Sequence, residues 1–402
     1  MMTKQGTVPR MPRTEQEADR LIALAEVDST NTLAGEMLAD GRIGGDPADD
    51  GKITVIAADY QTGGHGRLGR AWVNRPGESF TVSFVTVMPA DVVAADTVNG
   101  WLPTLAGLAS RDAIRSAVFS SGARPRQQDC ALSIKWPNDI FCHGLKLGGI
   151  LVQLVPLDEH RTGVIIGIGI NLALRAESLP TPQSTSLQLH VDPLPDVQVL
   201  RDLIAAGITA GLRDRIARFV RDRKAYAAQL LEETRQVSWT LGRRVEARLV
   251  GGETIVGRAI RINPDASLAI VDDEGVEHTV TTGDVGVSLP TLAGISDFSV
   301  FNSNPKTLVD ELTVTLVSSH KVVMASTPDK RYDPFKGRTI DQRCIIVTLD
   351  TSLRTREGWA CVKELPNYKT NVYAYTIDCD LTTAYPGIQC QTNMCGETTH
   401  RE

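Results

Sequence analysis

The spacing of apolar and polar positions predicts alternating helices and strands as far as about residue 233. Apolar residues at helical spacing predict three helices: one in "STNTLAGEMLADG", capped by Asp28 or Ser29 and ending near Gly41, one in "WLPTLAGLASRDAIRSAV", and one from about Asp196 to Glu233. Runs rich in β-branched residues predict strands in "ITVIAADYQ", "SFTVSFVTVMP", "ALSIKW", "DIFCHGLKLGGILVQLV" and "TGVIIGIGINL". The fourth run contains His143–Gly144, which predicts a hairpin turn.

The pattern changes at about Leu241. Short alternating strands follow, separated by turn signals at Gly251–Gly252, Asn263–Asp265 and Asp273–Gly275, and they predict a β-barrel of about fifty residues. After Pro290 the chain becomes a Thr-, Asn- and Cys-bearing tail with scattered apolar runs such as "RCIIVTLD". This tail is either another small β unit or poorly ordered.

Composition and charge exclude several classes of protein. At 402 residues the chain can form two or three domains, and its net charge of −6 argues against a general nucleic-acid binder. Apolar runs are too short to span a bilayer, and the polar first twenty residues lack the core of a secretory signal and are too short for a helix-turn-helix domain. We therefore expect a cytoplasmic protein.

Cysteines are distributed unevenly and give no zinc motif. Cys130 and Cys142 stand apart from five tail cysteines, none of which forms a C-x-x-C pair: Cys344, Cys361, Cys379, Cys390 and Cys395. Structural or incidental thiols are the expectation.

The stretch "QTGGHGRLGR" spells G-x-G-x-x-G, yet its context excludes a dinucleotide fold. Such a fold needs a helix that starts among the glycines and an acidic residue about twenty positions later. Here Arg75–Gly77 interrupts any helix, and "FVTVMP" carries no acid. A P-loop is excluded too, because Arg70–Ala71 replaces its Lys-Ser/Thr pair. A loop that closes Arg67 and Arg70 over an anion remains, with a glycine-rich hairpin of solvated arginines as the alternative.

Three further stretches favour the anion-binding alternative. "KWPND" (135–139), "KLGGIL" (146–151) and "GIGIN" (167–171) place cations, a carboxylate, amides and glycines at strand ends. Such groups are expected where a polyphosphate and a metal ion are bound.

The order of "DSTN", "QTGGHGRLGR", "KWPND", "KLGGIL" and "GIGIN" before a small barrel resembles biotin protein ligase, also called biotin–[acetyl-CoA-carboxylase] ligase. The resemblance covers about residues 22–289 and is to the type without an N-terminal DNA-binding domain. It implies an α+β fold: a class II synthetase-like mixed β-sheet with flanking helices, and an SH3-like β-barrel. The implied organisation is a flexible N-terminus (1–21), a catalytic domain (22–238), the barrel (239–290) and an extension of unknown role (291–402).

The resemblance also implies the reaction. Biotin attacks ATP, which is bound with Mg²⁺, to give biotinyl-5′-AMP, and biotin then passes to one lysine on the biotin carboxyl carrier domain of an acetyl-CoA, acyl-CoA or pyruvate carboxylase. No DNA or membrane partner is implied, and the protein is expected to be a monomer or homodimer. Because two anions must approach each other, preorganised cations should dominate catalysis.

The family's pattern assigns roles to residues of this chain. Lys146, Arg67 and Arg70 are the implied catalytic cations, and Asp139 is the implied Mg²⁺ ligand. The nucleotide would be bound by Arg67, Arg70, Trp72, Asn138, Lys146 and Asn171. The implied biotin contacts are Ser29, Thr30, Asn31, Gln61, Gly64, His65, Gly149, Ile150, Leu151, Gly167 and Gly169.

Two alternatives stay open, and one residue departs from the family. A lipoate or octanoate ligase would share the fold but need an elongated apolar pocket; Gln61 and the glycine loop favour biotin. A non-catalytic biotin-binding module is the other alternative, against which Lys146, Arg67 and Asp139 argue. His65 stands where many relatives carry Arg, which would weaken retention of the adenylate if the guanidinium contributes to it.

Overall fold

The computed structural model describes residues 6–94, 100–126, 132–249, 252–281 and 283–287, and the backbone of five short strands between residues 313 and 376. The chain separates into two compact units, residues 1–288 and 289–402. The first unit carries every predicted site residue.

A seven-stranded mixed sheet forms the centre of the first unit, with the order β1-β2-β3-β8-β7-β6-β5. β1 and β2 are parallel and the remaining neighbours are antiparallel. The strands are β1 (Arg20–Val27), β2 (Thr54–Gln61), β3 (Ser79–Pro89), β5 (Leu132–Lys135), β6 (Asp139–Cys142), β7 (Leu145–Pro156) and β8 (Arg161–Asn171). The mixed sheet and the strands expected from the five runs are thus confirmed.

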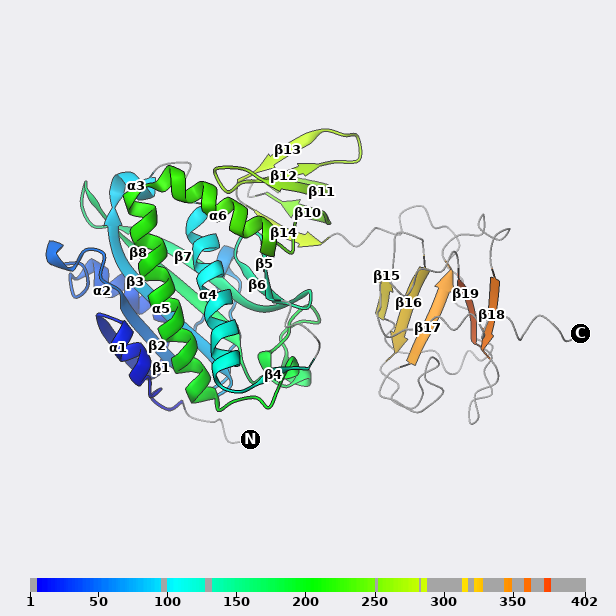
Figure 1. Cartoon of the computed structure of the whole chain (residues 1–402), viewed down its shortest axis with the longest axis horizontal. Helices are drawn as coiled ribbons and strands as arrows, with labels where there is room; N and C mark the ends of the chain where they lie inside the picture. Colours follow the sequence, from blue (N-terminus) through cyan, green and yellow to red (C-terminus); the bar gives the residue numbers. More distant parts are fainter. Residues whose placement is uncertain are drawn as a thin grey trace, which may run out of the picture. The chain divides into compact units, whose positions relative to one another are not determined.

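Helices cover both faces of this sheet (Figure 1). One face packs on α4 (Trp101–Ser120), α5 (Val197–Arg221) and α6 (Arg223–Val237); the other packs on α2 (Thr30–Ala39). Neighbouring residues of β8 point to opposite faces, so Ile166 joins the core under α4 and α5 while Ile165 joins the core under α2. Burial on both faces explains the near-continuous apolar runs of the central strands.

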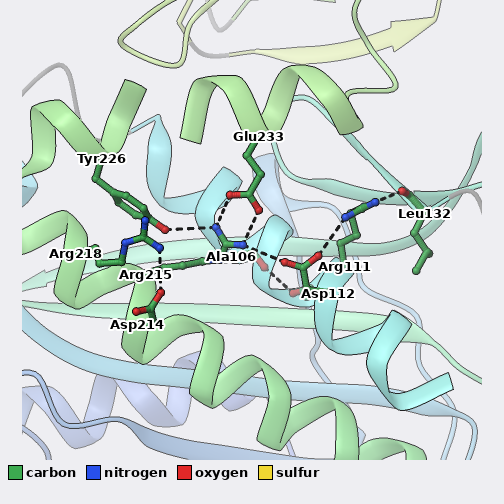
Figure 2. A network of polar contacts seen from close by, with 10 residues as sticks. Ala106, Arg111, Asp112, Leu132, Asp214, Arg215, Arg218, Tyr226 and Glu233 are labelled. Atoms are coloured by element: carbon green, nitrogen blue, oxygen red, sulfur yellow. Dashed lines mark hydrogen bonds and ion pairs between the residues drawn. The ribbon is translucent and has the colours of Figure 1, made fainter. Parts of the chain in front are cut away.

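A polar network fastens the three helices to one another (Figure 2). Arg215 of α5 donates to Asp112 of α4 (3.0 Å) and to both carboxylate oxygens of Glu233 of α6 (2.6 and 2.9 Å). Burial alone would lower the pKa of Arg215, but the hydrogen bonds and charge of Glu233 outweigh burial and raise that pKa. Arg215 therefore stays charged and joins all three helices.

The N-terminal segment contains a short helix that the apolar pattern did not predict. α1 (Pro12–Glu17) packs against α5, and the backbone N–H of Thr14, a fully buried residue, donates to Asp202 of that helix (2.8 Å). From Pro12 onward, the N-terminal segment that was expected to be flexible is therefore held in place by a long-range contact. Such a contact gives no periodic pattern in the sequence.

The predicted β-barrel region is a five-stranded antiparallel sheet with the order β13-β12-β11-β10-β14. Its strands are β10 (Arg244–Arg248), β11 (Thr254–Ile262), β12 (Leu268–Val271), β13 (Glu277–Val280) and β14 (Asp284–Val287). Two buried tryptophans attach it to the main sheet and its helices: the indole N–H of Trp101 donates to Pro264 O (2.9 Å), and that of Trp136 donates to Ala266 O (2.8 Å).

The remaining elements are short. β4 (Arg124–Pro125) pairs with β9 (Val191–Asp192), and α3 (Ala90–Ala94) and four 3₁₀ turns occupy connections: Pro47–Asp49, Arg67–Gly69, Ala176–Ser178 and Leu187–Leu189. In the second unit the strand backbones form two small sheets, β15 (Thr313–Leu316), β16 (Val322–Thr327) and β17 (Arg343–Thr348), and β18 (Gly358–Val362) with β19 (Val372–Thr376). Cys130 and the side chains of the tail cysteines lie outside the described residues. None of the described helices has the length and apolar character needed to cross a membrane.

Candidate functional site

The register of the sheet brings the separated motifs into one row. Asp139 of β6 pairs with Gly149 of β7, Gly149 with Gly169 of β8, and Gly169 with Thr81 of β3. Because paired residues point to the same face, residues from "KWPND", "KLGGIL" and "GIGIN" line one strip of the sheet. This strip lies on the face that packs against α2.

The N-terminus of α2 supplies polar groups beside this strip. The backbone N–H and hydroxyl of Thr30 donate to Gln61 Oε1 (2.8 and 2.9 Å), and Ser83 Oγ donates to Asn31 Oδ1 (2.6 Å). Ser29 caps the helix, as its position in the sequence predicted. These side chains are buried and hydrogen-bonded to one another, so they present donors and acceptors in fixed directions.

The glycine stretch is a narrow antiparallel loop between β2 and β3. Gly66 N–H donates to Arg70 O (2.7 Å), and Trp72 N–H donates to Gly64 O (2.8 Å). Leu68 and Gly69, at the tip, have φ of +55° and +71°, so the chain reverses there. Arg67 donates to Asn138 Oδ1 (3.1 Å) and thereby links the loop to "KWPND".

Two lysines converge on one carboxylate. Lys146 Nζ lies 2.8 Å from Asp139 Oδ1, and Lys135 Nζ lies 3.4 Å from Asp139 Oδ2. Asp139 is 9 % exposed, so the pairs lie largely away from solvent. The site therefore carries an excess of positive charge held in place by a single acid.

These groups enclose a cavity of about 380 Å³. All but one of the predicted site residues line it: Ser29, Thr30, Asn31, Gln61, His65, Arg67, Arg70, Trp72, Asn138, Asp139, Lys146, Gly149, Ile150, Leu151, Gly167, Gly169 and Asn171. The exception is Gly64, which lies behind the wall, where a Cβ would stand 2.8 Å from Gln61 Nε2.

Two of the glycines of β8, Gly167 and Gly169, make room for protein side chains. A Cβ at Gly167 would lie 2.2 Å from Asn31 Oδ1, and one at Gly169 would lie 2.3 Å from the Trp72 ring. The family resemblance implies that side chains at these two positions would fill the biotin pocket. In the structure they would displace the residues that form its walls.

Several lining residues were missed from the sequence. Lys135, the first residue of "KWPND", lines the cavity although the family's pattern assigned it no role. Loop residues 180–184 and β14 of the small sheet, through Val285 and Gly286, also line the cavity. Neither carries a motif: both reach the cavity only through tertiary packing.

Two buried polar atoms at the cavity have no hydrogen-bond partner among the residues that the structure describes. Asn171 donates through Nδ2 to Thr185 O (2.9 Å), which leaves its buried Oδ1 without a donor. The buried Nε1 of Trp72 likewise lacks an acceptor. Since buried polar groups are normally satisfied, these atoms suit hydrogen bonds to a bound ligand.

The residues do not fit a resident Mg²⁺ ion. Asp139 is the only carboxylate among the described lining residues, and a lysine stands at each of its oxygens. Protein-bound Mg²⁺ needs carboxylate oxygens that can face the ion. Asp139 is better suited to hold Lys135 and Lys146.

This chain is similar to known protein ligases. Residues 25–171 match the biotin/lipoate A/B protein ligase family, a range that includes every predicted site residue. The biotin–[acetyl-CoA-carboxylase] ligase of Mycobacterium tuberculosis is 33% identical over 266 residues, covering 66% of this chain and 88% of that protein. The bifunctional ligase/repressor BirA of Bacillus subtilis is 26% identical over 274 residues, covering 66% and 73%.

Among solved structures, the biotin protein ligase from Aquifex aeolicus in complex with biotin and ATP covers 67% of this chain and 99% of that chain, at 24% sequence identity and a TM-score of 0.49. The broad class indicated by the family model is that of protein ligases for biotin or lipoate. More particularly, as the mycobacterial relative shows, this chain belongs to the biotin–[acetyl-CoA-carboxylase] ligase family.

Proposed function

We propose that the cavity activates biotin with ATP as biotinyl-5′-AMP and transfers the biotinyl group to a lysine of a carboxylase carrier domain. The observation that carries this proposal is the convergence of Arg67, Lys146 and Lys135 around one cavity. Attack of a carboxylate on a phosphate brings like charges together, so fixed cations lower the barrier most.

The biotin end of the cavity is the polar cluster at α2. A ureido ring presents two N–H donors and one carbonyl acceptor, which the hydroxyls and amides of Ser29, Thr30 and Gln61 can match. Leu151, on β7 beside the cluster, would contact the apolar part of the vitamin. The side chain of Ile150 packs under α4 on the opposite face of the sheet, so Ile150 would face the vitamin through its backbone. Such a site discriminates against analogues that lack the ureido groups, because its buried polar atoms would then be unpaired.

The phosphate end is formed by the cations. Lys146 would stand between the biotin carboxylate and the α-phosphate, where an ammonium on a flexible stem can follow the oxygen that becomes negative. Arg67 and Arg70, on the glycine loop, would bind the phosphates and retain the adenylate. Asp139 would keep Lys146 in place before the nucleotide arrives.

The adenine would lie between Trp72 and Asn171. The unpartnered Oδ1 of Asn171 supports this proposal, since the exocyclic amine of adenine is a donor. Gly169 lies two residues before Asn171 on β8 and is in contact range of the Trp72 indole, so the indole and the amide lie at the same end of the cavity.

Incubation of the protein with ATP, Mg²⁺, labelled biotin and a purified carboxyl carrier domain tests the proposal. Label on the carrier lysine is expected, and its absence would contradict it. Octanoate and lipoate in parallel reactions separate the related ligases: transfer of either in preference to biotin would replace biotin as the substrate. Pyrophosphate release without label on the carrier would limit the activity to adenylate formation.

The Lys146→Ala variant tests the assignment of the bridging cation. We expect the rate of pyrophosphate release to fall by about 10²–10³-fold, because a charge aimed at the developing anion is lost. Lys224→Ala, an exposed residue of α6, is the matched control and should retain the parent rate. A Lys146→Ala enzyme as fast as the parent would remove Lys146 from the mechanism.

A further inference from the structure

A second group of chemically reactive side chains lies near the cavity at the β6–β7 hairpin. Cys142, His143 and His190 place a sulfur and two ring nitrogens all within 4.8 Å of one another. Cys142 is buried and both histidines are half-buried, so one side of the group remains accessible to an ion from solvent. The two imidazole rings lie nearly parallel, with their centroids 5.0 Å apart.

The backbone explains how two consecutive residues reach one point. Side chains of adjacent residues in a strand point to opposite faces, so Cys142 and His143 would diverge in a continuous β6. His143 instead has φ of +50° and Gly144 has φ of +80°, which turns the chain directly after Cys142. This turn brings the imidazole back to the side of the sulfur.

The third side chain, that of His190, already contacts Thr185. Nε2 of His190 lies 2.7 Å from Thr185 Oγ1, so Nδ1 is the nitrogen left to meet an ion. Metal-binding histidines commonly use their second nitrogen in this way, which fixes the ring and its tautomer.

We propose that Cys142, His143 and His190 bind a divalent ion of the zinc class, with water or an external ligand in the fourth position. One thiolate and two imidazoles form a ligand set that Zn²⁺ favours. Bond lengths of roughly 2.0–2.3 Å place tetrahedral ligand atoms roughly 3.3–3.8 Å apart, so a spacing of 4.8 Å would need to contract by about 1–1.5 Å. On binding, the Cys142 thiol releases its proton to solvent and the sulfur donates its electron pair to the ion.

Thr185 connects this group to the ligase cavity. Its backbone N–H donates to Lys146 O (2.8 Å), its own O accepts from Asn171 Nδ2 (2.9 Å), and its hydroxyl lies against His190. An ion at Cys142 and the histidines would therefore stiffen the loop that supports two cavity residues. The ion would take no part in the chemistry of the ligase.

Cobalt binding tests the site without any measurement of ligase activity. The full-length, untagged chain is prepared with serine at the other six cysteines, Cys130, Cys344, Cys361, Cys379, Cys390 and Cys395, so that only Cys142 can supply a thiolate. Titration with Co²⁺ is expected to give one bound ion and a thiolate-to-cobalt charge-transfer band. Zn²⁺ should displace Co²⁺ and raise the melting temperature.

Variants of this background identify the ligands. Cys142→Ser should abolish the charge-transfer band, and His143→Asn, which keeps a residue tolerant of positive φ, should weaken Co²⁺ binding. Thr185→Val keeps the backbone hydrogen bonds of the loop. It should weaken Co²⁺ binding by roughly 10–100-fold, the usual effect of losing a group that orients a metal ligand. His160→Gln, whose side chain is 81% exposed, is the control and should bind Co²⁺ like the background.

The proposal is overturned if the folded background protein, checked by circular dichroism, shows no charge-transfer band, or if the band survives Cys142→Ser. Should the background fail to fold, the native chain and its Cys142→Ser variant are compared by metal analysis after desalting in Zn²⁺. If the Cys142→Ser variant contains one equivalent of zinc less than the native chain, the proposal is supported. If the two proteins contain equal amounts of zinc, the proposal is overturned.

Discussion

At the scale of single residues, the site depends on small groups in places where a larger one would collide. Gly169 pairs with Gly149 and Thr81 across the sheet, and its missing side chain is where the Trp72 ring rests. The glycine is needed for a neighbour to approach closely, since its φ is not in the left-handed region. The sequence alone could not identify that neighbour.

Gly169→Ala is therefore expected to displace Trp72 while the fold survives. A methyl group 2.3 Å from the indole moves the ring, because the ring lies on a loop and can shift. The rate of adenylation should fall by about 10²-fold because Trp72, a residue of the cavity wall, is displaced. The free energy of unfolding should fall by about 1–3 kcal/mol. Pyrophosphate release and thermal unfolding measure the two effects.

Gly35→Ala is the control for this prediction. Gly35 lies in α2, and a Cβ there has its nearest neighbour at 3.9 Å, in ordinary contact. Activity should be unchanged and stability should rise slightly, since alanine is the better helix former. Equal activity of Gly169→Ala and the parent would show that the Trp72 position is irrelevant to the reaction.

At the scale of elements, polar contacts fix the relative positions of helices and strands that apolar packing alone would not fix. Arg215 reaches Asp112 and Glu233 from the C-terminal part of α5, and Arg111 donates to Leu132 O (3.0 Å), which joins α4 to β5 (Figure 2). These contacts lie on the side of the sheet away from the cavity. They stabilise the layer that supports the strands of the site.

Glu233→Gln should destabilise this layer. The variant keeps the shape of the side chain but removes a charge that receives two hydrogen bonds from Arg215, whose side chain is 12% exposed. Hydrogen bonds to charged groups contribute about 1.5–3 kcal/mol, so a loss of this size in the free energy of unfolding is expected. Urea denaturation measures it.

Glu232→Gln provides the comparison for Glu233→Gln. Its side chain is 63% exposed and its nitrogen–oxygen contact with Arg235 is long, at 3.8 Å. Exposed pairs of this kind contribute at most about 1 kcal/mol. Similar losses for the two variants would contradict a specific role for the Arg215–Glu233 contact.

The β12–β13 turn should make stability sensitive to acid. The hydrogen bond from His278 and then the backbone N–H of Val276 lower the pKa of Asp272 below its ordinary value of 3.8. A depressed carboxyl pKa stabilises the folded state above pH 3.8, and this contribution is lost as the pH falls below that value and through the folded pKa.

Asp272→Asn should accordingly flatten the fall of melting temperature with pH below about pH 4. Glu253→Gln, at an exposed position of the same sheet, should keep the slope of the parent. A variant at Asp272 with the parent's slope would show that other carboxylates control the acid sensitivity.

At the scale of the whole molecule, the ligase site belongs to the first of two units. The described cavity residues extend from Ser29 to Gly286, so β14 of the small sheet is needed to complete the wall. The tail strands pair among themselves in separate sheets. The small sheet is therefore part of the site, while the tail supplies none of the described lining residues.

Removal of residues 291–402 should leave biotin transfer and the melting of the first unit unchanged. A chain that ends at residue 281 is the informative comparison, because it also lacks β14, which pairs with β10 and supplies Val285 and Gly286. That shorter chain should lose both stability and activity. A loss of activity in the longer truncation would assign the tail a role in the reaction.

The sequence by itself determined the elements and the chemistry of the motifs. Period-two and period-3.6 patterns are local, so strands such as β3 and β8 and helices such as α4 could be predicted from them. The order of the motifs then predicted the family. Arg75–Gly77 was sufficient to exclude a helix after the glycine stretch.

Only the tertiary structure decided which residues meet. Register placed Asp139, Gly149 and Gly169 in one row, folding placed Lys135 on the same carboxylate as Lys146, and packing brought β14 to the cavity. The physical reason is that contacts between residues distant in the chain depend on how whole elements pack. A short segment carries no periodic signal of that packing.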